Sequence, residues 1–293
     1  MSDPRNYQRR GLARPPREKK GLFKFFEIYG RHMWKLMQVN IIYVVIFIPF
    51  VASWWLSAKF NSYAPFALCL ITAVCFGPAT AGMTKVCRNY SQERHAFAFA
   101  DFFESFKKNF KQSLIMGIID TIFIVGFTVA IPTYLKWAEK DSFMYVPFVM
   151  TLSFLIVFFM MHFYIYLMIS STTLSLFKIL RNSFFLVPLG LKASISTFAT
   201  WIFVVLMILF LYPYTLFIIP FWPLSFLCFV SAYNCYPVIR KFVIQPYYDA
   251  KGEDNPEFDY LKKKDNETVF EDNPELDKPV DKKEIKKKGK TIS

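Results

Sequence analysis

The stretch FGPATAGMTKVCRNYSQERHAFAFADFFESFKKNFKQS, residues 76–113, decides how the chain is organised. Its first part closes an apolar run and contains Gly77 and Pro78. Because proline has no N–H, the carbonyl of Val74 loses its helical hydrogen-bond donor, and lipid offers no water to replace it. The sequence therefore predicts a broken membrane helix here, which serves either as a packing kink or as a gate or ligand contact.

The second part of the stretch predicts an amphipathic helix. Asp101, followed three residues later by Glu104, indicates a variant capping box that would start this helix. Its aromatic side chains fall on one face and its lysines on the other, a distribution typical of a helix in the membrane interface. The helix either rests on the ends of a bundle or offers a docking surface to a cytoplasmic protein. The residues of this predicted docking helix are Phe102, Phe103, Phe106, Lys107, Lys108, Phe110 and Lys111.

The composition indicates a membrane protein. The 293 residues are 54% hydrophobic and include 35 Phe, values that soluble proteins rarely combine. We predict an all-α, polytopic membrane helix bundle of about six transmembrane helices, with the interfacial amphipathic helix between the second and third. The apolar segments long enough to span hydrocarbon are 35–57, 63–87, 113–134, 143–171, 197–219 and 221–239. Prolines interrupt the last pair, which could form a tight hairpin or one long broken element.

The placement of charge predicts the orientation of the bundle. With six spans, only Lys59, Lys136 and Lys140 of the 35 basic residues lie in outer loops. The positive-inside rule then places both termini in the cytoplasm of a multi-pass protein.

The two ends of the chain differ in composition from the region between them. We divide the chain into a basic arm (1–21), a membrane domain (22–245) and a charged tail (246–293). Both ends are expected to be disordered and cytoplasmic, because they hold too few apolar residues to bury a core. The tail repeats EDNPEFD (253–259) as EDNPELD (271–277), which indicates either a low-complexity expansion or a paired short motif for a partner.

Four polar residues, Asn40, Asp120, His162 and Asn234, stand inside predicted spans. A rise of 1.5 Å per residue places all four at about 7–13 Å from the inner ends of their segments. An unpaired carboxylate is costly in hydrocarbon, so Asp120 should face the bundle interior or a water-filled cavity. The four either form a cluster that binds a proton, ion or polar ligand, or simply join helices through hydrogen bonds.

No sequence pattern supports an enzyme, a metal site or a cofactor. Phosphate-binding loops and the HExxH, CxxC and GxSxG motifs do not occur, and the five cysteines show no metal-ligand or redox spacing. Nucleic acid is not an expected partner, because the basic residues flank apolar spans instead of covering a soluble domain.

Three motifs in the central region, FGPATA (76–81), DFF (101–103) and FKKNFKQS (106–113), resemble the YesL-like family. Its members are integral membrane proteins of Gram-positive bacteria, grouped as a domain of unknown function. The resemblance implies a bacterial cell membrane and an association with carbohydrate-uptake systems, but it brings no established activity.

Two functions follow as expectations. The first is a non-enzymatic accessory subunit for carbohydrate uptake, which would contact a membrane transporter through residues 102–113, the loop 174–192 and the tail. The alternative is a small-solute or proton-coupled transporter that uses the inner-side polar cluster. The solute and the oligomeric state do not follow from the sequence.

Overall fold

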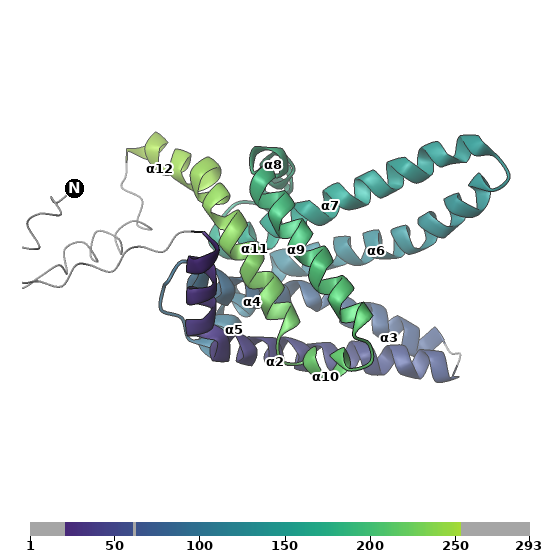
Figure 1. Ribbon diagram of the computed structural model, residues 1–293, viewed down its shortest axis with the longest axis horizontal. Helices are drawn as coiled ribbons and strands as arrows, with labels where there is room; N and C mark the ends of the chain where they lie inside the picture. Colours follow the sequence, from purple (N-terminus) through teal and green to yellow (C-terminus); the bar gives the residue numbers. More distant parts are fainter. Residues whose placement is uncertain (1–20, 61–62, 253–293) are drawn as a thin grey trace, which may run out of the picture. The chain divides into compact units, whose positions relative to one another are not determined.

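The computed structural model describes residues 21–60 and 63–252, in which every regular element is a helix (Figure 1). The first twenty residues of the predicted arm and most of the predicted tail, with its repeated motif, lie outside the described residues. The elements are α2 (Leu22–Phe60), α3 (Tyr63–Val74), α4 (Phe76–Ser91), α5 (Ala98–Lys108), α6 (Phe110–Ala138), the 3₁₀ turn η1 (Ser142–Met144), α7 (Tyr145–Ser171), α8 (Leu176–Leu189), α9 (Leu191–Phe210), α10 (Thr215–Ile218), α11 (Pro223–Ile239), the π-helical turn η2 (Arg240–Ile244) and α12 (Gln245–Lys251). The chain divides into two compact units at Ile244, and α12 belongs to the second.

The predicted all-α membrane bundle is confirmed. Within the described residues, five helical stretches are long and apolar enough to cross a membrane: α2, the α3–α4 stretch from Ala67, α6, η1 with α7, and α9. The sixth expected span corresponds to α11, which has 17 residues, or about 26 Å at 1.5 Å per residue. Most of α11 is buried against its neighbours.

The last two expected spans form a helical hairpin, which settles the alternative left open by the sequence. α9 and α11 pack against each other, with the single turn α10 between them. α9 ends at Phe210, nine residues earlier than expected, because the chain turns before Pro213. Pro223 occupies the first turn of α11, where the missing N–H of proline costs no helical hydrogen bond.

α2 is longer than a membrane span requires. Its 39 residues measure about 58 Å, against a hydrocarbon thickness of about 30 Å. The first turns of α2 bury Phe25 and Tyr29 against Phe226 and Phe229 of α11. Aromatic packing therefore joins the start of α2 to the buried helix α11.

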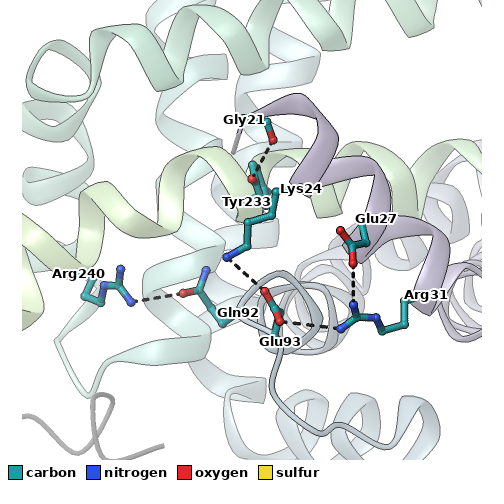
Figure 2. A network of polar contacts seen from close by, with 8 residues as sticks. All are labelled: Gly21, Lys24, Glu27, Arg31, Gln92, Glu93, Tyr233 and Arg240. Carbon is teal, nitrogen blue, oxygen red and sulfur yellow. Dashed lines mark hydrogen bonds and ion pairs between the residues drawn. The ribbon is translucent and has the colours of Figure 1, made fainter. Parts of the chain in front are cut away.

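The loop after α4 is held to the same part of α2 by charge. Glu93 adopts a positive φ of 55°, and its carboxylate lies 3.3 Å from Lys24 Nζ and 3.9 Å from Arg31 Nη1 (Figure 2). Beside it, Arg240 of η2 donates a hydrogen bond to Gln92 Oε1 at 3.5 Å. The loop thus connects α2, α4 and η2 through polar side chains at their ends.

Replacing Glu93 by glutamine is expected to lower the thermal stability modestly, because it removes the ion pairs with Lys24 and Arg31 and keeps the side-chain shape. Partly exposed pairs of this kind are worth up to about 1 kcal/mol, and high salt should reduce the difference from the wild type. Glu93→Gly should cost less than Glu93→Gln, since glycine adopts a positive φ without strain. Melting temperatures of the purified protein at low and high salt measure both effects; a larger loss for Glu93→Gly would contradict this account.

Candidate functional site

The predicted helix break is present and packs directly on α6. α3 ends at Val74, Cys75 forms a turn, and α4 begins at Phe76. A Cβ added to Gly117 of α6 would lie 2.5 Å from the carbonyl oxygen of Val74, the group that Pro78 deprives of its helical donor. A Cβ at Gly77 would overlap the carbonyl of Ser113 in the same way. Two glycines thus bring the backbones of the broken helix and α6 into contact.

This contact fixes the position of Asp120, which lies three residues after Gly117 on α6. The carboxylate of Asp120 meets two side chains of α7: Oδ1 lies 2.7 Å from Nε2 of His162, and Oδ2 accepts a hydrogen bond of 2.7 Å from the hydroxyl of Tyr166. The two α7 residues are four apart and therefore share a helical face. About a fifth of each member of the ion pair remains accessible, 18% for Asp120 and 23% for His162, so a ligand can reach both.

The hydrogen bonds of the ring define the proton content of the pair. His162 Nδ1 lies 2.8 Å from the carbonyl oxygen of Phe158, which can only accept, so Nδ1 carries a proton. A second proton is needed between Nε2 and the Asp120 oxygen, because two lone pairs would repel at 2.7 Å. Whether this proton sits on nitrogen or oxygen, the pair has no net charge, which suits a site inside a membrane bundle.

The pair lies on the wall of a cavity of about 810 Å³. Hydroxyl groups surround it there: Tyr43 of α2 and Thr80 of α4 lie 3.1 Å apart, and Thr84 donates to the Thr80 carbonyl. Most of the remaining lining is aliphatic or aromatic and comes from α2, α3, α4, α6, α7, α9 and α11. Among the described residues that line this cavity, Asp120 is the only carboxylate and His162 the only imidazole.

The structure brings together only two of the four polar residues that the sequence singled out. Asn40 is buried, donates to the carbonyl of Ile219 and accepts from the amide of Ser225, both at 2.8 Å. Asn234 donates to the hydroxyl of Thr197 at 3.1 Å. Neither lines the cavity, so the four residues do not lie together: Asn40 and Asn234 join helices, the second of the two alternatives, whereas Asp120 and His162 contact each other on the cavity wall.

The residues of the predicted docking helix belong to two helices, α5 and α6. α5 begins at Ala98, not at Asp101, because the Asp101 carboxylate reaches back and accepts the Phe97 amide at 2.8 Å. α5 ends at Lys108, so the last two residues of the predicted surface, Phe110 and Lys111, belong to α6. Of the remaining five, Phe102 is fully buried, Phe106 is partly buried, and Phe103, Lys107 and Lys108 are exposed.

Sequence reasoning missed Tyr166 and Tyr43. Tyrosines are frequent in this chain and carry no signal alone. The spacing of four residues between His162 and Tyr166 was the available signal, because it places both on one helical face. Among the described residues, no group of three His, Cys, Asp or Glu side chains is placed to hold a metal ion.

Comparison with known proteins gives one match. A family model described as "Protein of unknown function, DUF624" matches residues 53–131, about a quarter of the chain. The matched part runs from the end of α2 through the broken helix and α5 to Asp120 and beyond on α6, and it stops before α7. No curated protein matches the chain, and no solved structure does.

Proposed function

We propose that this chain is an integral membrane protein that binds a small organic solute in the cavity beside Asp120 and His162. The bound solute is exchanged for the proton that these two residues share. This corresponds to a proton-coupled transporter. The observation that supports it is the neutral Asp120–His162 pair on the wall of a cavity within apolar helices. Ionisable groups at such positions are costly, and they commonly mark substrate paths or proton relays.

The chemistry of the exchange follows from the charge balance. A cationic group that binds Asp120 replaces the shared proton and leaves the cavity neutral. Loss of the proton without a replacement would leave an uncompensated carboxylate among aromatic walls, which is unfavourable. Proton and solute therefore compete for one position, as coupling requires.

Replacement of Asp120 by asparagine is expected to weaken ligand binding by at least about tenfold. The test measures the melting temperature of purified protein with a panel of organic ammonium ions, polyols and carboxylates. A ligand at a hundredfold excess over its Kd should raise it by about 5 °C or more in the wild type. The matched control is Asp141→Asn, because Asp141 is exposed in the turn between α6 and α7 and does not line the cavity.

The result expected is that at least one class of solute stabilises the wild type and Asp141→Asn equally, and Asp120→Asn clearly less at the same concentration. If no class stabilises the protein in an Asp120-dependent way, the transporter proposal fails.

A second candidate is the accessory subunit for carbohydrate uptake that the resemblance implies. The exposed phenylalanines Phe97, Phe99 and Phe103, beside Lys107 and Lys108 on and before α5, favour it. A photo-crosslinker at position 99 should then give a defined adduct with a sugar-transporter subunit in native membranes. The control is a crosslinker at Gly126, where an added Cβ would meet no atom within 4 Å. If both positions give adducts with lipid alone, this candidate is excluded.

For either function we propose a location in the bacterial cell membrane with both termini cytoplasmic. The distribution of lysine and arginine supports this orientation. A reporter that works only in the cytoplasm should be active when it is fused after Lys251. If a reporter that works only outside the cytoplasm is active there instead, the C-terminus lies outside and the proposed orientation is wrong.

A further inference from the structure

We infer that the ligand of the cavity is a single-chain amphiphile with a cationic amine head, whose head binds Asp120 and whose chain lies between the α2–α3 and α6–α7 hairpins. This inference rests on the proposed function and names its class of substrate. It follows from the distribution of polar residues along the cavity, the length of the cavity, its access to lipid and its charge.

The cavity is polar at one end and apolar at the other. On α6 the lining runs from Gly117 and Asp120 to Phe127 and Val129, where the hydroxyl of Thr128 bonds the Val125 carbonyl of its own helix. On α2 the lining runs from Tyr43 to Trp54. α7 runs in the opposite direction, so its lining changes from apolar at Leu155 to polar at His162 and Tyr166 along the chain. All three helices therefore place their polar lining at the same end, next to α4. A ligand that satisfies both ends must itself be amphiphilic.

The length of the cavity matches one lipid chain. Eleven residues separate Tyr43 from Trp54 along α2, and twelve separate Gly117 from Val129 along α6, which correspond to about 16 and 18 Å. The hydrocarbon of one leaflet is about 15 Å deep, half of the ~30 Å core. The volume of about 810 Å³ lies within the range of pockets that hold drug-sized ligands.

The apolar end opens towards lipid. The two hairpins diverge towards their connecting turns (Figure 1), and the lining residues at that end are exposed: 58% for Trp54, 62% for Ile124 and 62% for Val129. These residues belong to helices long and apolar enough to span a membrane, so their exposed surface faces hydrocarbon. A chain can therefore enter sideways from the bilayer without passing through water.

The head group must supply the selectivity. A chain that moves from lipid into an apolar cavity gains little, because both surroundings are hydrophobic. At the polar end the described lining offers one carboxylate, several hydroxyl oxygens and no lysine or arginine. The carboxylate of Asp120 holds two partners and can accept about four hydrogen bonds. Phe123 and Phe158, whose rings lie 4.4 Å apart beside His162, add aromatic faces that attract a cation. An ammonium fits this set, and a carboxylate would face Asp120 with like charge.

Tryptophan quenching in lipid nanodiscs tests the inference. Trp201 lines the cavity, so a variant that keeps Trp201 and carries phenylalanine at the other five tryptophans reports on its interior. The probes are amphiphiles with one brominated alkyl chain and an amine, hydroxyl or carboxylate head. A second variant that keeps only Trp137, which does not line the cavity, measures partition into the bilayer alone. The melting temperature of the unaltered chain with the same three probes provides a readout that does not depend on the tryptophan replacements.

We expect the amine probe to quench Trp201 saturably and to raise the melting temperature, with an apparent affinity at least about tenfold above that of the carboxylate probe. Asp120→Asn should weaken the amine probe by at least about tenfold, as loss of one charge-assisted hydrogen bond predicts, and Asp141→Asn should not. Equal quenching by the three heads, or quenching that follows Trp137 without saturation, would overturn the inference. If a water-soluble solute of the earlier panel, such as choline, then still stabilises the protein in an Asp120-dependent way, the proposed function stands and only the amphiphile is wrong. If no solute of that panel does, both fail.

Discussion

Replacement of Gly117 by alanine is expected to destabilise the bundle severely. The added Cβ would lie 2.5 Å from the carbonyl oxygen of Val74, which is backbone and cannot turn aside. α6 and the broken helix must then separate. Overpacking a well-packed interface costs about 1–3 kcal/mol, and a clash with backbone should reach or exceed the upper end of this range. The measurement is the melting temperature of purified protein, together with the amount of folded protein in the membrane.

Gly126→Ala provides the matched control on the same helix. A Cβ at Gly126 meets nothing within 4 Å, so this replacement should be neutral or slightly stabilising, because alanine favours a helix by about 0.5–1 kcal/mol over glycine. If the two alanine variants proved equally stable, the close contact between Gly117 and Val74 could not exist.

Replacement of Asn40 by leucine should have the second large effect. Its amide bonds the carbonyl of Ile219 and the N–H of Ser225, two backbone groups at either side of the turn that leads into α11. Leucine fills a similar volume but leaves both groups without their side-chain partner. An unsatisfied buried polar group costs about 1–3 kcal/mol, so the loss should amount to several kcal/mol.

Two variants calibrate this prediction. Asn40→Asp keeps the acceptor for Ser225 but brings a second oxygen towards the carbonyl of Ile219, which it can bond only in its protonated form, so we expect a melting temperature below that of the wild type. Asn234→Leu removes one hydrogen bond to the Thr197 side chain and should cost less than Asn40→Leu. Equal losses for Asn40→Leu and Asn234→Leu would show that the α10–α11 turn does not depend on Asn40.

The sequence predicted the fold class because spans and their flanking charges are one-dimensional signals. Apolar length identified the bundle, and Pro78 located the break to within a few residues, at Cys75. The last hairpin was ambiguous because α11 is short and its prolines favour several turn geometries. Only the packing of α9 against α11 decides between a hairpin and a broken helix.

The polar cluster shows the limit of reasoning from depth. Asn40, Asp120, His162 and Asn234 were placed at similar depths, but depth does not give direction around the helix axis. Packing turns Asn40 towards the start of α11 and Asn234 towards Thr197, and only Asp120 and His162 face each other. The start of the helix at Asp101 was ambiguous for a similar reason. A carboxylate can cap a helix from the position before its first residue, or it can accept the amide of a preceding residue from inside the first turn, as Asp101 does with Phe97.

The sharing of one proton by Asp120 and His162 is the central claim of this account, and nitrogen NMR of the imidazole tests it most directly. The chain has three histidines, so replacement of His32 and His95 by glutamine leaves the His162 ring as the only histidine signal. We predict that Nδ1 carries a proton and that the Nε2 resonance shifts when Asp120 is replaced by asparagine, but not when Asp141 is. An unprotonated Nδ1, or an Nε2 resonance that ignores the Asp120 replacement, would contradict the account.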